Sequence, residues 1–378
     1  MGSTFKFVHC ADLHLGSAVH AKGREGALLE SFSRIVDLAV RERADAMFIS
    51  GDVYDSSAAS PSVRHALAAE MSRFGGRVLI ARGNHDSAAP WDGSIPYPPN
   101  VHEFPAEPES IVVDTPGGQF EAVGVSFQSQ HDGRDLVSML RGRGDMFTVA
   151  CVHCDAGGSA GYAPFDPASL AGRGVDYWAL GHIHKRQVVS RDPWAVYPGN
   201  IQGRDMGETG EKGAYIVTVT DGRVSDARFV PTQSFCFREL RADITGRTLQ
   251  DVESELRAQA SKGDIARVTL SGVGVLDGML RRDPADAARA LGRALGCTVQ
   301  EVRVLTGPER SPGPVADEVA SKAEEMAALP RQRIMEILMA KTMLKPYRAY
   351  FESLPDEEFY GMVRGAAGLA ASALGGRR

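Results

Sequence analysis

The sequence has few cysteines, no long apolar run and no excess of positive charge. Five cysteines in 378 residues is an odd number, and their spacing suggests no disulfide framework. No apolar stretch approaches the roughly 20 residues needed to cross a bilayer. The first residues lack the basic and apolar regions of a signal peptide. These absences favour a protein of the reducing cytoplasm that does not associate with membranes.

The formal net charge of −6 argues mildly against a dedicated nucleic-acid coat protein. It does not exclude chemistry on DNA, because metal ions and a local basic patch can supply positive potential. Hydrophobic and charged contents of 43% and 24% are ordinary for a soluble globular protein. The length is sufficient for one large domain and one or two smaller ones.

The first 230 residues or so alternate between β-type and helical patterns. Buried strands are predicted at 5–11, 46–50, 77–81, 146–152 and 175–180. Amphipathic helices are predicted at 25–43 and 61–74. A proline-rich segment, 88–108, is expected to form a surface loop over the site.

After about residue 233 the pattern changes. Three predicted strands, 235–244, 265–275 and 298–305, alternate with predicted helices at 249–260 and 285–295, which indicates a compact βαβαβ unit. Ser311-Pro-Gly-Pro314 is a linker signal, and predicted helices follow it at 315–329, 331–344 and 355–374. We therefore expect domains at 1–233, 234–310 and 311–378.

Side chains of the kinds that bind metals follow the predicted strands at their carboxyl ends. They are Asp12, His14, Asp52, Asn84, His85, His153, His182 and His184. Ligands of open α/β sheets bind outside these ends, and half of the ten histidines occur here. Carboxylate, imidazole and amide groups without thiolate suit Mn, Fe or Zn. Leaving His85 aside, the seven groups exceed the needs of one tetrahedral ion, so we expect two ions that share a carboxylate.

The order Asp-x-His, Gly-Asp, Gly-Asn-His-Asp, a lone His and Gly-His-x-His resembles the calcineurin-like metallophosphoesterases over roughly residues 4–230. Within that family, the segments 9–16, 197–204 and 208–210 resemble the SbcD/YhaO-type branch of DNA-repair nucleases. The resemblance implies an α/β fold, a metallophosphoesterase β-sandwich flanked by helices. A small α/β cap domain and a helical C-terminal tail match the branch only in layout.

The resemblance also implies a role for each residue. One divalent ion would be held by Asp12, His14 and His184, the other by Asn84, His153 and His182, and Asp52 would bridge both. Mn²⁺ is the expected ion, and a metal-bound hydroxide would attack the phosphorus in line. His85 is the expected general acid for the leaving oxygen, with Asp55 orienting it.

Several further features have two interpretations. Lys185, Arg186, Arg191 and Arg204 are candidate contacts for DNA phosphates, or members of a solvated loop edge. Trp91 and Tyr97 are candidates for stacking on bases, or part of a lid packed on its own prolines. An apolar stripe in the tail, 334–343, indicates internal packing, whereas the resemblance suggests docking onto the coiled coil of an SMC-like ATPase.

The leading hypothesis is a two-metal-dependent nuclease that hydrolyses DNA phosphodiesters in DNA repair, with an SMC-like coiled-coil ATPase subunit as partner. The first alternative is a phosphodiesterase or phosphatase that acts on a small molecule. The second is a scaffold subunit with a vestigial metal site. The sequence leaves open exonuclease versus endonuclease activity, and whether the chain forms a homodimer.

Overall fold

The computed structural model describes residues 3–56, 59–87, 95–158, 161–307, 321–322 and 324–375. The chain divides into two compact units, Met1–Phe237 and Arg238–Arg378. Trp91 and the linker signal at Ser311–Pro314 lie outside the described residues. The domain boundaries expected at 233 and 310 stay predictions.

The first unit contains two six-stranded sheets. In the first sheet the strand order is β14-β13-β1-β2-β3-β4. Four strands run parallel: β1 (Thr4–Cys10), β2 (Ala46–Ser50), β3 (Arg77–Ala81) and β4 (Val101–Glu103). Two antiparallel strands extend the sheet beyond β1, namely β13 (Gly213–Thr220) and β14 (Arg223–Pro231).

The second sheet has the order β11-β12-β10-β7-β6-β5. Its parallel strands are β12 (Trp194–Tyr197), β10 (Tyr177–Gly181), β7 (Thr148–His153) and β6 (Gly118–Val125). Antiparallel edges are formed by β11 (Gln187–Arg191) and β5 (Glu109–Thr115). Short elements beside it are α3 (Leu136–Met139), β8 (Asp155–Ala156), β9 (Pro164–Phe165) and a 3₁₀ helix, η1 (Pro167–Leu170).

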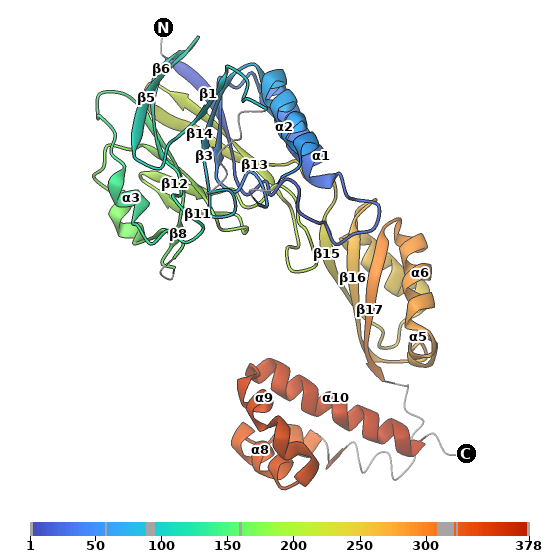
Figure 1. Ribbon diagram of the computed structural model, residues 1–378. Coiled ribbons are helices and arrows are strands. Elements are labelled where there is room, and N and C mark those ends of the chain that lie inside the picture. Colours follow the sequence, from blue (N-terminus) through green and yellow to red (C-terminus); the bar gives the residue numbers. More distant parts are fainter. Residues whose placement is uncertain are drawn as a thin grey trace. The chain divides into compact units, whose positions relative to one another are not determined.

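Alternation along β1 explains how the layers pack. Phe5 and Phe7 belong to the apolar cluster that fills the space between the two sheets. Val8 and Cys10 belong instead to the cluster under the helices α1 (Ala27–Glu42) and α2 (Pro61–Phe74). These helices lie side by side along the outer face of the first sheet (Figure 1). The result is a sandwich of two sheets flanked by helices.

The region predicted as a cap domain contains a three-stranded sheet of β15 (Phe237–Asp243), β16 (Ile265–Val273) and β17 (Thr298–Gly307). Its helices are α4 (Leu249–Gln259), α5 (Asp277–Arg282) and α6 (Pro284–Leu295). The tail consists of α8 (Arg331–Met339), a 3₁₀ helix η2 (Thr342–Tyr347), α9 (Arg348–Ser353) and α10 (Asp356–Gly375). No helix in the described ranges is long and apolar enough to cross a bilayer.

These elements confirm the predicted fold class, a mixed α/β sandwich with helices at the C-terminus. The predicted helix at 331–344 was wrong in extent, because α8 ends at Met339 and Pro346, which has no backbone N–H, lies in the 3₁₀ segment that follows. The predicted loop at 88–108 contains the three-residue strand β4. The edge strands β11 and β14 were missed, since they are rich in polar residues and lack the apolar run on which strand prediction depends.

The aromatic and apolar side chains singled out in the loop and the tail are mostly packed internally. Tyr97 is half-buried and packs against the cluster beneath α1 and α2. In the tail, Ile334 is buried with Phe351 and Phe359. Met343 is the exception, with 86% of its surface exposed.

Candidate metal centre

The carboxyl ends of five parallel strands bring the predicted ligands together. From the first sheet, Asp12 and His14 follow β1, Asp52 follows β2 and Asn84 follows β3; from the second sheet, His153 ends β7, and His182 and His184 follow β10. The ligands from the first sheet and His153 are buried, whereas His182 and His184 are half-buried. All seven predicted ligands therefore lie in one region between the two sheets.

Three glycines that directly precede ligands allow the strand ends to approach so closely. A Cβ atom added to Gly51 would lie 2.2 Å from His153 Nδ1, and one added to Gly83 would lie 2.2 Å from Asp52 Oδ1. At Gly181 a Cβ would lie 1.6 Å from the backbone oxygen of the residue that ends β2. Only a residue without a side chain fits at these three positions, which explains why glycine precedes the ligand in the Gly-Asp, Gly-Asn-His and Gly-His motifs.

The backbone is strained at the same place. Among the described residues, seven that are not glycine have a positive φ, and four of them are predicted ligands. The four are Asp12 (53°), His14 (44°), Asp52 (49°) and His182 (107°). Each such conformation costs about 1–3 kcal/mol, and residues of this kind cluster at functional sites. The strain therefore supports a functional role for these strand ends.

The first ligand group consists of Asp12, His14 and His184, whose ligand atoms lie within 4.8 Å of one another. His184 Nδ1 donates a hydrogen bond to Glu208 Oε1 at 2.7 Å, and His14 Nδ1 lies 3.2 Å from Asp55 Oδ1. With the protons on Nδ1, the lone pairs of both Nε2 atoms face each other across 3.0 Å. Two facing lone pairs repel, so this arrangement fits a cation held between them.

The second group shows the same feature. His153 Nδ1 donates to the backbone oxygen of Ser50 at 3.0 Å, which leaves the lone pair on Nε2. That Nε2 lies 3.1 Å from Asn84 Oδ1 and 3.3 Å from His182 Nδ1. A carbonyl oxygen cannot donate a proton, so acceptors again face one another, and a cation would satisfy them.

Asp52 lies between the two groups. Its Oδ2 is 3.5 Å from His153 Nε2 and 3.7 Å from His14 Nε2, a position suited to a bridging carboxylate. Burial alone would raise the pKa of Asp52, but the neighbouring His153 and His14 hold it below its ordinary value. Burial raises the pKa of Asp12, the second carboxylate of the centre. Two buried carboxylates among imidazoles thus form a site whose charge divalent cations would balance.

His85 lies beside this cluster with 40% of its side chain exposed. Its Nδ1 donates to the backbone oxygen of Asp55 at 2.9 Å, while the Asp55 carboxylate is 3.9 Å away and nearer to His14. The backbone carbonyl of Asp55 therefore orients the ring. The roles of His85 and Asp55 in catalysis stay predictions.

Comparison with known proteins places the chain in a family. A family model described as calcineurin-like phosphoesterase matches residues 5–186. The uncharacterized metallophosphoesterase YhaO of Bacillus subtilis is 33% identical over 283 residues, which cover 68% of this chain and 69% of that protein. The chain belongs to the calcineurin-like metallophosphoesterases. This confirms the family resemblance of the sequence motifs.

More distant relatives of this metallophosphoesterase are nucleases or repair proteins by name. The DNA double-strand break repair protein Mre11 of Methanopyrus kandleri is 23% identical over 306 residues, covering 71% of this chain and 65% of that protein. One component of the nuclease SbcCD of Escherichia coli K12 is 28% identical over 88 residues, covering 22% of each chain. The chain thus spans about two thirds of the length of the first two relatives and far less of the third.

Glu208 of this metallophosphoesterase is a supporting residue that was not among the predicted site residues. Its carboxylate accepts hydrogen bonds from His184 Nδ1 at 2.7 Å, from Arg204 and from Asn200. Burial opposes its ionisation, but the hydrogen bonds from His184 and Arg204 hold the pKa of Glu208 well below its usual range. It therefore fixes the tautomer and the orientation of one predicted ligand. The only signal for it in the sequence was its place in the 208–210 segment of the family resemblance.

Asp86 is a second such residue, and it ends the Gly-Asn-His-Asp motif. Its Oδ2 accepts from the backbone N–H groups of Val53 and Tyr54 at 2.8 and 3.3 Å, and its Oδ1 accepts from that of Gly83 at 2.8 Å. Asp86 thus ties together the loops that carry Asp52 and Asn84. Burial, and then the charge of Asp52, raise the pKa of Asp86 to about 7.

The side chains predicted to contact DNA differ in how many interactions they already make within the protein. Lys185 and Arg186 are exposed, and the Arg186 guanidinium lies 4.0 Å from the centre of the Phe229 ring. Arg204 donates to Asp55 at 3.3 Å and also binds Glu208, so its charge is already balanced by carboxylates. Binding of DNA phosphates by these three side chains stays a prediction.

Proposed function

We propose that this metallophosphoesterase is a two-metal-dependent nuclease that hydrolyses DNA phosphodiester bonds in DNA repair. The observation that carries the proposal is the pair of sites at which imidazole and carbonyl lone pairs face one another around Asp52. The names of the Mre11 and SbcCD relatives support DNA as the substrate.

The donor set fits two divalent ions, with Mn²⁺ as the proposed metal. One ion would be held by Asp12, His14 and His184, the other by Asn84, His153 and His182, with Asp52 shared. When bound, such ions supply Lewis-acid stabilisation of the charge on a phosphoryl group and lower the pKa of water.

The remaining residues position groups and move a proton. The hydrogen bond from His85 Nδ1 to the Asp55 carbonyl leaves Nε2 free, so the imidazolium form would give its Nε2 proton to a leaving oxygen. Its exposure gives a polymeric substrate access to that nitrogen. Glu208 and Asp86 hold His184 and the two loops in place.

A cleavage assay tests the substrate. The full chain, loaded with Mn²⁺, is offered end-labelled single- and double-stranded DNA and, in parallel, 3′,5′-cyclic nucleotides. We expect metal-dependent cleavage of DNA that chelation abolishes. Turnover of cyclic nucleotides alone would instead support the small-molecule phosphodiesterase. No turnover of any substrate by metal-loaded protein would support the vestigial scaffold.

A second assay tests the general acid. We expect His85→Ala to lower turnover by about 10²–10⁴-fold while the metal content stays close to that of the wild type. His65→Ala is the matched control, since His65 is an exposed histidine on α2, outside the site. Undiminished turnover in His85→Ala would remove His85 from the mechanism.

We further propose an SMC-like coiled-coil ATPase as partner, because the SbcCD relative is by name one subunit of a nuclease. The tail buries Ile334 and Phe359 but leaves 86% of Met343 and 57% of Tyr347 exposed. We expect Met343→Glu to weaken co-purification with such an ATPase, and the matched control Lys345→Glu to weaken it less. Equal recovery of the ATPase with all three proteins would contradict docking through the tail.

A further inference from the structure

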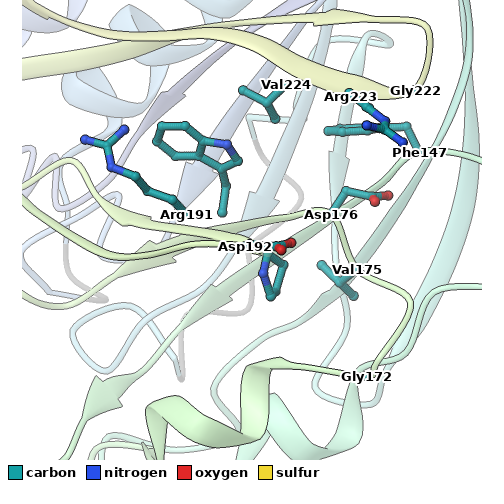
Figure 2. A pocket seen from close by; sticks show the side chains of 11 residues that line it. Phe147, Gly172, Val175, Asp176, Arg191, Asp192, Gly222, Arg223 and Val224 are labelled. Atoms are coloured by element: carbon teal, nitrogen blue, oxygen red, sulfur yellow. The ribbon is translucent and has the colours of Figure 1, made fainter.

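A cavity of about 730 Å³ lies at the opposite end of the sandwich from the metal centre. It is lined by the residues that precede β7 and β10, by the turn between β11 and β12, and by the turn between β13 and β14 (Figure 2). The strands β7 and β10 carry His153 and His182 at their other ends. At about 3.3 Å per residue, a five-residue strand places the cavity roughly 17 Å from the metal centre.

Two arginines at the cavity have no carboxylate partner. Arg191 and Arg223 are exposed, and within the described part of the chain neither forms an ion pair. The two side chains lie on opposite sides of the cavity in Figure 2. Guanidinium groups without a counterion, at the rim of a concave site, are suited to binding a phosphate.

Aromatic rings also line the cavity. Trp194, the first residue of β12, is half-buried, and the guanidinium of Arg191 lies 4.9 Å from its ring centre. Phe147 adds a second, almost fully buried ring to the lining. Indole rings bind nucleobases by stacking, and an adjacent arginine strengthens such a contact.

The cavity also contains a carboxyl group with a free acceptor. Asp176 Oδ2 accepts from the backbone N–H of Thr148 at 2.8 Å, and no hydrogen bond from a described residue reaches Oδ1. In Figure 2 this carboxyl lies on the Arg223 side of the cavity. Asp192, exposed on the turn, also lines the cavity. Two acidic and two basic side chains make a poor site for a plain anion and a better one for a ligand with both an anionic group and hydrogen-bond donors.

We propose that this cavity binds a nucleoside monophosphate whose base carries an exocyclic amine. The base stacks on Trp194, the amine donates to Asp176, and Arg191, on the side of the cavity away from Asp176, holds the phosphate. The volume lies within the range of about 300–1,000 Å³ that is usual for sites of small ligands. Because the cavity is remote from the metal centre, its ligand is distinct from the substrate, and the inference holds whether or not the protein cleaves DNA. A bound nucleotide would contact hairpins of both sheets and so brace the sandwich.

Binding is measured by calorimetry with the full chain in excess EDTA, so that metal ions at the candidate centre do not contribute. The ligands are dAMP, dCMP, dTMP and inorganic phosphate. We expect dAMP and dCMP to bind about tenfold more tightly than dTMP, because thymine lacks the amine. Phosphate alone should bind more weakly than any nucleotide. Equal binding of phosphate and dAMP, or no binding of any nucleotide, would overturn the proposal.

Variants locate the site. Arg191→Gln should weaken dAMP binding by about tenfold, whereas Arg41→Gln, which changes an exposed arginine at the end of α1, should not. Asp176→Asn keeps an oxygen for the Thr148 N–H but can present an N–H₂ group to the cavity. It should therefore reverse the preference in favour of dTMP, whose base offers a carbonyl there, an outcome that a merely structural defect would not produce. Unchanged affinity in Arg191→Gln together with unchanged preference in Asp176→Asn, with melting temperatures near that of the wild type, would overturn the assignment.

Discussion

The metal centre and the cap domain use charged side chains in opposite ways. In the centre, Asp12 and Asp52 are 0% and 2% exposed and have histidines as their nearest partners. In the cap, Arg267 bonds to Glu239 at 3.1 Å and to Glu301 at 2.6 Å on the solvent side of the sheet. Burying an ion costs several kcal/mol, whereas exposed pairs contribute about 0–1 kcal/mol. The charged side chains of the cap remain hydrated at the surface. Those of the centre are buried although their burial lowers the stability of the fold.

The backbones differ in the same sense. The four strained ligands of the centre have no counterpart in the described cap residues, 238–307, where only glycines have a positive φ. The cap helix α4 starts instead with a capping box, in which Thr248 and Asp251 exchange side-chain hydrogen bonds with each other's backbone N–H groups. Local rules of helix and turn formation are obeyed in the cap and broken at the centre, which is the pattern expected when one of two regions carries function.

The largest expected effect comes from Asp12→Asn. The amide retains an oxygen for the His182 N–H, which the carboxylate accepts at 3.1 Å, but loses the charge. We expect metal-dependent turnover to fall by about 10³-fold or more. In EDTA, the melting temperature should equal or exceed that of the wild type, because a costly buried charge is gone. Differential scanning calorimetry with and without Mn²⁺ checks this. A much lower melting temperature of Asp12→Asn in EDTA would show that the buried carboxylate of Asp12 stabilises the fold, against this expectation.

Glu208→Gln should have a smaller effect. The glutamine oxygen still accepts a hydrogen bond from His184 Nδ1 but carries no charge, so His184 becomes a less basic and less firmly oriented metal ligand. We expect the affinity for Mn²⁺ to fall by about 10–100-fold, as measured by metal titration. Glu211→Gln, an exposed neighbour, is the control. Equal affinities of the two variants would show that Glu208 does not support the ligand.

The pH dependence of stability should distinguish the centre further. The pKa of Asp86 is raised from 3.8 to about 7, so the folded protein retains a proton that the unfolded chain releases between about pH 4 and pH 7. The contribution of this group to stability is therefore present at low pH and is lost as the pH rises through that window. In metal-free protein, the free energy of unfolding of the wild type, taken relative to that of Asp86→Asn, should fall by on the order of a few kcal/mol from pH 4 to pH 8. Urea unfolding at both values measures it, and a constant difference would refute the shift.

The smallest effect is expected in the cap. Arg267→Gln removes both ion pairs of that side chain, and we expect a loss of less than about 1 kcal/mol with no change in Mn²⁺ affinity. Chemical unfolding followed by metal titration checks both values. A loss as large as that expected for a buried ion would erase the contrast between the two regions.

The sequence predicted those parts of the centre that follow from strand ends. Buried apolar runs located β1, β2, β3, β7 and β10, and because parallel strands end at the same edge, the polar residues behind them could be grouped. The ring-orienting carbonyl of Asp55 could not be predicted, since every residue has a carbonyl and only the fold selects one. Glu208 lies in an irregular segment without periodicity, so its contact with His184 arises from tertiary structure alone.

The division of the ligands between two sheets has a consequence for the molecule as a whole. Asp12 and His14 come from the first sheet and meet His184 of the second, while Asn84 of the first meets His153 of the second. Each cation would therefore link the two sheets, because neither sheet alone supplies all the ligands of either ion. A substitution at Phe7 or Phe48, in the apolar cluster between the two sheets, would shift the sheets relative to each other. Such a shift would abolish metal binding and activity under conditions in which the protein is still folded.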